Sequence, residues 1–489
     1  MPAESGVPLR TALVVFGLIL VATPSSFAGS RSPVDCNHLM AWLAGNASNH
    51  VLLNTVSQRG VTFALTPQLT KQLVAGGASP ELLNLLRRAQ SKQMGACSAT
   101  LAEAAADAHA KRFDSAEQIV SSLLDNDPNN GALHFALGYL EQQQGDWDDA
   151  FDEYTNSKQS EPDFAEVHDR LALVFYQGDD GDNAIGEART ALSMDFDDPL
   201  AYRLLALGHY ANEQYDAAMN AFQEALIRDP NNADVYYEMG LVARDQKSND
   251  AAIQAFQRSL ELNPKRWQAH SSLGALLGDE KRFAEAIAEL NRAKAMVPDE
   301  PSVRENLANV YFGKGDVDKA IAEYRELFRL NPNWRHGHDS LARAYMAKDE
   351  YSSAIDEMKL AIEQDPASAG KHRALGQLLL AADQQANAVR ELRIAVELDP
   401  NSAASHYSLG TGLLQNGQLP AALVEFQEAV RLDPSAEHHY ALAACLMNMG
   451  RDREALAEMQ TATRLDPEKQ LYHAREEELI RLMRSGTSQ

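Results

Sequence analysis

The chain has 489 residues, of which 45% are hydrophobic and 23% are charged, and its net charge is −25. This composition is ordinary for a folded protein. A surface so acidic repels phosphate backbones and anionic lipids, so the charge argues against binding to nucleic acid or to membrane surfaces. The three cysteines, Cys36, Cys97 and Cys445, include no CxxC pair, which argues against a disulfide framework and against a zinc site.

The first 28 residues are predicted to be a signal peptide. Arg10 precedes an apolar run at 11–22, which suits the core of a signal peptide and is too short for a membrane span of about 20 residues. Ser26 and Ala28 supply the small side chains expected before a cut after Ala28. We therefore expect an exported chain, periplasmic or secreted, without stable membrane insertion. An uncleaved amino-terminal anchor is the alternative.

Residues 29–96 are predicted to form a small helical N-terminal domain. Helices are expected near 36–45, 49–58, 67–75 and 80–90, because glycines and a proline separate these apolar stretches.

Two cysteines flank this domain. An exported chain meets an oxidising space, so Cys36 and Cys97 are a possible disulfide that would join the domain to the residues that follow. Cα atoms more than about 7 Å apart would exclude that bond without movement of the backbone.

From residue 97 onward the sequence repeats every 34 residues, and proline marks most of the repeat ends. These prolines are Pro128, Pro162, Pro230, Pro264, Pro298, Pro332, Pro366, Pro400 and Pro434. Phe196 takes the one vacant place, and Pro467 follows a single deletion. Alanine recurs twelve residues before each place, as at Ala286 and Ala320, and glycine or alanine recurs twelve residues earlier still, as at Gly274.

This pattern resembles the tetratricopeptide repeat, in which a Leu-Gly or Leu-Ala pair, a later alanine and a final proline recur at a period of 34. The resemblance implies an all-α fold, a right-handed α-solenoid of helix pairs, with about eleven repeats at 97–468. Residues 469–489 then form a capping helix and a tail. The small side chains lie where the two helices of a pair approach closely, and a larger side chain there would overpack the contact.

No catalytic motif is present in the sequence. The chain has no glycine-rich phosphate loop, no HExxH and no GxSxG. The histidine pairs His336/His338 and His438/His439 lack the i, i+4 spacing that places two metal ligands on one helix face. We therefore expect no enzyme activity, no cofactor and no bound metal.

The resemblance also predicts a binding surface. In repeats of this kind, positions 5, 9 and 12 of the first helix face the concave side. Here those positions supply Phe135, Tyr139, Tyr176, Tyr210, Tyr237, Arg244, Asn309, Phe312, Arg343, Arg373, Gln377, Tyr407 and Tyr440. Aromatic and arginine side chains are favoured at recognition surfaces. We expect Tyr176, Tyr210 and Tyr237 to act as apolar anchors, and Arg343 and Arg373 to pair with acidic groups of a partner.

These features predict a non-enzymatic scaffold or adaptor that binds a protein or peptide in its concave groove, in the cell envelope or in the secreted space. The alternative is the substrate-recognition arm of a separate transferase or of a polysaccharide-export machine. A catalytic domain after the array would favour the transferase. Only residues 469–489 follow the last repeat, so we expect any catalysis to reside in another chain.

Overall fold

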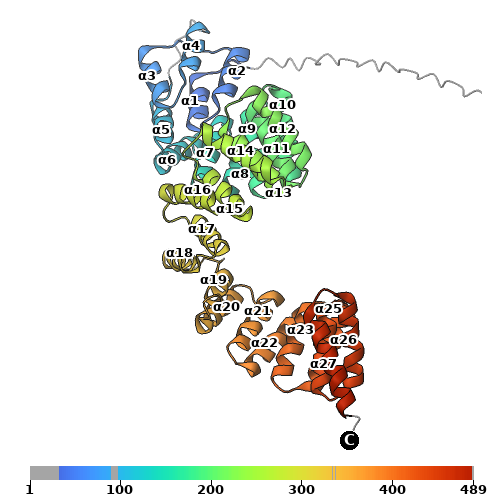
Figure 1. Ribbon diagram of the computed structural model, residues 1–489. Helices are drawn as coiled ribbons and strands as arrows, with labels where there is room; N and C mark the ends of the chain where they lie inside the picture. The colour runs from blue at the N-terminus through green and yellow to red at the C-terminus, as the bar shows by residue number, and fades with distance from the viewer. Residues whose placement is uncertain (1–31, 90–96, 333, 336, 487–489) are drawn as a thin grey trace, which may run out of the picture. The chain divides into compact units, whose positions relative to one another are not determined.

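The computed structural model describes residues 32–89, 97–332, 334–335 and 337–486 (Figure 1). Within these ranges the chain forms 27 α-helices and no β-strand, and its extended pairing is limited to a parallel bridge between Val34 and Val61. The prediction of an all-α fold is therefore confirmed. The predicted signal peptide, residues 1–28, lies outside the described residues.

Four short helices precede the repeats. They are α1 (Cys36–Ala44), α2 (Asn49–Arg59), α3 (Pro67–Ala75) and α4 (Pro80–Arg88), close to the four predicted ranges. Each begins at a side chain that accepts a backbone N–H, as at Asp35, Ser48, Thr66 and Ser79. Glycine follows the last residue of α1, α2 and α3, so the predicted glycine breaks are confirmed.

Eleven helix pairs follow in the predicted register. The first helices of the pairs are α5 (Ala99–His109), α7 (Gly131–Gln144), α9 (Ala165–Gln177), α11 (Pro199–Ala211), α13 (Ala233–Asp245), α15 (Trp267–Asp279), α17 (Pro301–Lys314), α19 (His338–Met346), α21 (Ala369–Ala381), α23 (Ala403–Gln415) and α25 (Ala436–Asn448). The second helices are α6 (Phe113–Leu124), α8 (Trp147–Ser160), α10 (Gly181–Met194), α12 (Tyr215–Arg228), α14 (Asn249–Leu262), α16 (Phe283–Met296), α18 (Val317–Leu330), α20 (Tyr351–Gln364), α22 (Gln385–Leu398), α24 (Leu419–Leu432) and α26 (Asp452–Leu465). Helix α27 (Gln470–Gly486) packs on α26 and buries Tyr472 and Leu479.

The small residues of the period lie at the contact between the helices of a pair. Ala286 and Ala320 are fully buried, and a Cβ atom on Gly274 would lie 2.6 Å from Leu290 Cγ. These sites leave no room for a longer side chain, as the repeat pattern predicts.

A residue in the left-handed conformation ends the first helix of every pair. These residues are Lys111, Gly145, Asp179, Glu213, Lys247, Lys281, Gly315, Asp349, Asp383, Gly417 and Gly450. In the turn at Lys281, its own N–H donates to Gly278 O and the N–H of Arg282 donates to Leu277 O. This pair of bonds is a Schellman motif, which satisfies the last carbonyl groups of the helix and turns the chain back for the second helix.

The chain divides into two compact parts at a repeat boundary. We call residues 1–229 the N-terminal half and residues 230–489 the C-terminal half. In the C-terminal half several neighbouring first helices contact one another, as α21 contacts α23 and α23 contacts α25. Among the described residues, no two neighbouring second helices approach as closely. The first helices therefore line the inner, concave side, and the second helices form the outer side.

Candidate partner-binding surface

Nine of the predicted binding residues lie on first helices of the C-terminal half, and none of the nine is buried. Arg244, Asn309, Arg343 and Gln377 are exposed. Tyr237, Phe312, Arg373, Tyr407 and Tyr440 are partly exposed. The inner face of this half therefore presents aromatic, amide and guanidinium groups to solvent.

Neighbouring side chains hold the three tyrosines in place. The ring of Tyr237 lies 5.8 Å from that of Phe256, and the Arg266 guanidinium lies 4.4 Å from its centroid. Tyr407 contacts the ring of His438 on the next first helix, with 5.4 Å between centroids. Tyr440 lies 5.0 Å from Tyr472 of α27. One side of each ring packs against the protein, and the rings remain partly accessible.

The polar residues of the same face hold short hydrogen bonds. Gln377 Nε2 donates to Ser408 Oγ at 3.0 Å, which connects α21 to α23. Arg343 Nη2 donates to Ser340 Oγ at 2.9 Å, and the hydroxyl of Tyr324 donates to Asn309 Oδ1. No hydrogen bond or ion pair between described residues holds Arg373.

In the N-terminal half, two of the four predicted binding residues are covered. Phe135 is fully buried, and Tyr139 is only 9% exposed, so neither is available to a partner in this structure. Helix α1 contacts both α5 and α7. A Cβ atom on Gly45, the residue that caps α1, would lie 2.5 Å from the Phe135 ring, so the backbone of the first segment lies directly on that side chain.

Aromatic packing continues this contact toward α9. The indole of Trp42 stacks on the ring of Phe164 at 4.5 Å, and Phe164 in turn meets the edge of Phe135 at 5.2 Å. One hydrophobic core contains these residues and extends from Val34 to Val174. Helix α1 is therefore an internal helix of the N-terminal half.

Polar contacts complete the cover over the third repeat. The backbone N–H of Ser48 donates to Glu166 Oε2 at 3.1 Å, and Arg170 Nη2 donates to Asn46 O at 2.8 Å. Asn54 Nδ2 donates to Asp195 Oδ2 at 2.6 Å. Helix α1 and the turn that leads to α2 thus lie against α5, α7 and α9, the first helices of the first three repeats. Tyr176 and Tyr210, at position 12 of α9 and α11, remain partly exposed.

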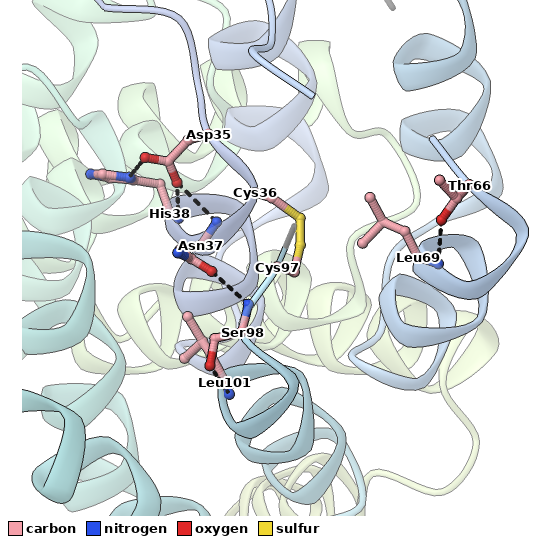
Figure 2. The surroundings of a disulfide bond; sticks show 9 residues. All are labelled: Asp35, Cys36, Asn37, His38, Thr66, Leu69, Cys97, Ser98 and Leu101. Carbon is pink, nitrogen blue, oxygen red and sulfur yellow. Dashed lines mark hydrogen bonds and ion pairs between the residues drawn. A yellow bond between two sulfur atoms is a disulfide. The ribbon is translucent and has the colours of Figure 1, made fainter. Parts of the chain in front are cut away.

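A disulfide joins Cys36 at the start of α1 to Cys97 just before α5 (Figure 2). The two Cα atoms lie 5.3 Å apart, within the range that a disulfide spans. The backbone N–H of Ser98 also donates to Asn37 Oδ1 at 2.9 Å. Both links hold the N-terminus of α1 to the start of the repeats.

Three buried carboxyl groups lie beneath α2. Glu166 and Asp169 of α9 and Asp198, which caps α11, are at most 1% exposed. Glu166 accepts hydrogen bonds from Ser48 N and Arg170, whereas no donor reaches Asp169. Burial, together with the charges of Asp198 and Glu166, raises the pKa of Asp169 well above its usual range. Burial and Glu166 raise the pKa of Asp198 to about 6.

A histidine clamp recurs along the array, and the sequence analysis missed it. Seven histidines at position 4 of a first helix bond through Nδ1 to a glutamate 19 residues later, on the second helix. They are His134, His168, His270, His338, His372, His406 and His439. In His270, Nε2 also donates to Pro264 O at 3.2 Å, at the end of the preceding repeat. The clamp joins the two helices of a pair and links them to the preceding repeat. At His134, the hydrogen bond to Glu153 raises the pKa of the imidazole.

Within the described ranges, no three His, Cys, Asp or Glu side chains are grouped to hold a metal ion, and no helix is long and apolar enough to cross a membrane. A cavity of about 800 Å³ lies between α20, α21 and α22. A second cavity of about 410 Å³ lies between α22 and the turn that joins α23 to α24. Such clefts recur where neighbouring second helices diverge, so we attribute them to the repeat geometry.

Several solved structures are similar to the chain at low sequence identity. The chain is similar to pilF of Pseudomonas aeruginosa (22% identity, 42% of this chain and 93% of that one, TM-score 0.37). It is also similar to yeast Tom70 (15% identity, 78% and 95%, TM-score 0.38) and to a repeat protein of Parabacteroides merdae (15% identity, 51% and 98%, TM-score 0.41). Likenesses of this size are no basis for transferring a partner. No curated protein matches the chain significantly.

Family models place the repeats in the sequence. One model of the tetratricopeptide repeat matches residues 100–163, 170–233, 203–266, 237–301, 373–437 and 407–469, and a second matches 277–344. The first model alone covers more than half of the chain, in the same register as the helix pairs. The chain therefore belongs to the tetratricopeptide repeat family, whose members are protein–protein interaction scaffolds.

Proposed function

We propose that this protein is an exported scaffold that binds a segment of another protein along the inner face of its C-terminal half. We choose the inner face of the C-terminal half on the basis of one observation. Gly45 at the end of α1 lies on Phe135, and Phe113 and Arg170 contact the ring of Tyr139, whereas none of the nine predicted binding residues of the C-terminal half is buried. A partner can reach the second set without displacing part of the core.

The partly packed tyrosines suit this role. Tyr237, Tyr407 and Tyr440 each rest on a neighbouring ring, so little side-chain freedom remains to be lost when a partner binds. Binding costs about 0.5–1.5 kcal/mol for each flexible side chain that becomes fixed, and preorganised rings avoid much of that cost. Tyrosine also contributes a large apolar area together with a hydroxyl group, which favours it at interfaces.

Two features support export. The apolar run at 11–22 with Ala28 at the expected cut has the form of a signal peptide. The Cys36–Cys97 disulfide suits an oxidising compartment, since cytosolic thiols stay reduced. The test is amino-terminal sequencing of the protein from its native cells. A mature chain that begins at Gly29 is expected, and an intact Met1 in the cytosolic fraction would contradict export.

Photocrosslinking in the native cells tests the binding face. We would replace Gln377, which is exposed on α21, by p-benzoylphenylalanine, and identify the captured proteins by mass spectrometry. The matched control carries the same group at Val424, which is 60% exposed on α24, an outer helix. A protein captured at position 377 and absent at position 424 is expected. Equal capture at both positions, or capture only at 424, would contradict binding along the inner face.

A further inference from the structure

The inner face of α21, α23 and α25 carries no acidic side chain, in contrast to the acidic composition of the chain as a whole. Position 5 of these helices carries Arg373, Tyr407 and Tyr440, and position 12 carries Leu380, Leu414 and Met447. Position 9 carries Gln377, Thr411 and Ala444. We call these nine positions the C-terminal inner face. None of the nine is buried and none is acidic, although the chain has 69 acidic residues and a net charge of −25.

Contacts between neighbouring first helices make this face continuous. Gln377 bonds to Ser408 across α21 and α23, Tyr407 contacts His438 across α23 and α25, and Tyr440 contacts Tyr472 of α27. Carboxylates lie at its edges. Glu437, in the first turn of α25, is close enough to Tyr407 to add to the effect of burial in raising the pKa of that phenol. On the preceding first helix, α19, Asp339 takes position 5.

Arg373 gives the face its charge. Several arginines of this half hold a carboxylate, as Arg431 holds Glu428 at its Nε, 2.9 Å from Oε1, and Arg451 holds Glu454. No described residue makes a hydrogen bond or an ion pair with Arg373, which is partly buried. A guanidinium beside an apolar surface favours a planar carboxylate, which it can bind through two parallel hydrogen bonds.

The spacing of the first helices sets the spacing of the ligand. Packed helices lie about 8–10 Å apart, so Arg373, Tyr407 and Tyr440 follow one another at steps of about that length. A peptide in the extended polyproline II conformation advances about 3.1 Å per residue with three residues per turn, so every third side chain lies on one face and three residues cover one step. From this geometry, and on the basis of the proposed function, we propose that the C-terminal inner face binds an extended peptide with one acidic and two apolar residues at three-residue intervals. The acidic residue meets Arg373, and the apolar residues meet the surfaces around Tyr407 and Tyr440.

Peptide selection tests this proposal. The full chain, without its first 28 residues and with its disulfide intact, is used to select from a displayed library of random 12-residue peptides. We expect the selected peptides to be enriched in an acidic residue with two apolar residues at three-residue intervals, before or after it. The substitution Arg373→Glu should weaken the selected peptide at least tenfold, and changing the acidic residue of the peptide to lysine should restore binding to that variant. Arg390→Glu, an exposed charge reversal on the outer helix α22, should leave affinity unchanged.

Hydrogen exchange with the bound peptide separates this proposal from the proposed function. Protection of α21, α23 and α25 supports both. Protection confined to the first helices α13–α19 overturns the ligand assignment and leaves binding along the inner face in place. Protection of second helices alone overturns both. Selected peptides without an acidic residue, or a library that yields no binder, also overturn the proposal for this face.

Discussion

Asp169 is a buried acid of the N-terminal half whose two carboxyl oxygens both lack a hydrogen-bond partner. It is 1% exposed, and a hydrogen bond forms there only if Asp169 or Asp198 keeps a proton and donates it to the other. Glu166, one turn away on α9, is equally buried but receives a backbone N–H from Ser48 and a guanidinium from Arg170. The two acids thus differ in their partners and not in their depth. An ionised carboxylate without partners is costly to bury, so folding favours the protonated form of Asp169.

The substitution Asp169→Asn should stabilise the protein at neutral and alkaline pH. The pKa of Asp169 is raised in the folded state, so above the unfolded value of about 3.9 the folded state holds a proton that the unfolded chain has released. Stability therefore falls by up to about 1.4 kcal/mol for each pH unit between the unfolded and the folded pKa. Asparagine cannot ionise, and its amide can still donate to Asp198. Urea unfolding at pH 8 should show a gain of about 1 kcal/mol or more, which disappears near pH 3.5.

Asp152→Asn is the matched control for this substitution, because Asp152 is exposed on α8. The variants should be compared at both pH values by the same unfolding measurement. A loss of stability at pH 8 in Asp169→Asn would mean that the carboxylate is ionised in the folded protein and has a partner there.

At the scale of the helix pair, much of the structure could be predicted from the sequence. The period of 34 places both helices of each repeat, because small residues mark the close contact and proline marks the end. The histidine clamp was missed, although its spacing is regular. The sequence shows a histidine six residues after the proline and a glutamate 19 residues later, as in Pro400, His406 and Glu425. Only the fold brings these three groups together.

The turn inside each pair leads to opposite predictions for two nearby glycines. Gly315 has a φ of +91°, and a Cβ atom there would meet nothing within 4 Å, so Gly315→Ala should cost about 1 kcal/mol through backbone strain alone. Gly313 lies within α17, and its Cβ atom would make an ordinary contact, 3.4 Å from the Phe283 ring. Gly313→Ala should therefore stabilise the helix by up to about 1 kcal/mol. Thermal unfolding of the two variants measures this difference. Equal effects would mean that the left-handed turn is not a constraint.

The cover over the first repeats could not be predicted from local pattern. Phe135 and Tyr407 both occupy position 5 of a first helix. The sequence pattern at that position is the same whether the aromatic ring is covered by its own chain or by a partner. The contact joins Gly45 to a residue far along the sequence, and beside it Trp42 stacks on Phe164, which packs against Phe135. Neither pairing leaves a periodic signal. The pattern therefore predicts the positions of the inner face, and the three-dimensional structure distinguishes the covered positions from the open ones.

At the scale of the whole molecule, the stability of a repeat array is approximately a sum of neighbour contacts. A local change then weakens the repeats next to it more than distant ones. The chain offers a test of this rule, because Cys36 and Cys97 form a disulfide in the N-terminal half, whereas Cys445 is a free, buried thiol in the C-terminal half. The disulfide closes a loop between residues 61 positions apart.

Removing the disulfide should loosen α1 and α2 and leave the C-terminal half unchanged. On a chain-entropy estimate, closing so long a loop contributes about 4 kcal/mol, which the variant Cys36→Ala/Cys97→Ala would lose. Hydrogen exchange should rise in α1, α2 and the first helices that they cover, and residues 230–489 should keep their protection. Cys445→Ala is the control that acts in the opposite half, where it leaves a small cavity beside Leu419. If faster exchange in the double variant extended to α17–α27, the array would unfold as one cooperative body, and its stability would not be a sum of neighbour contacts.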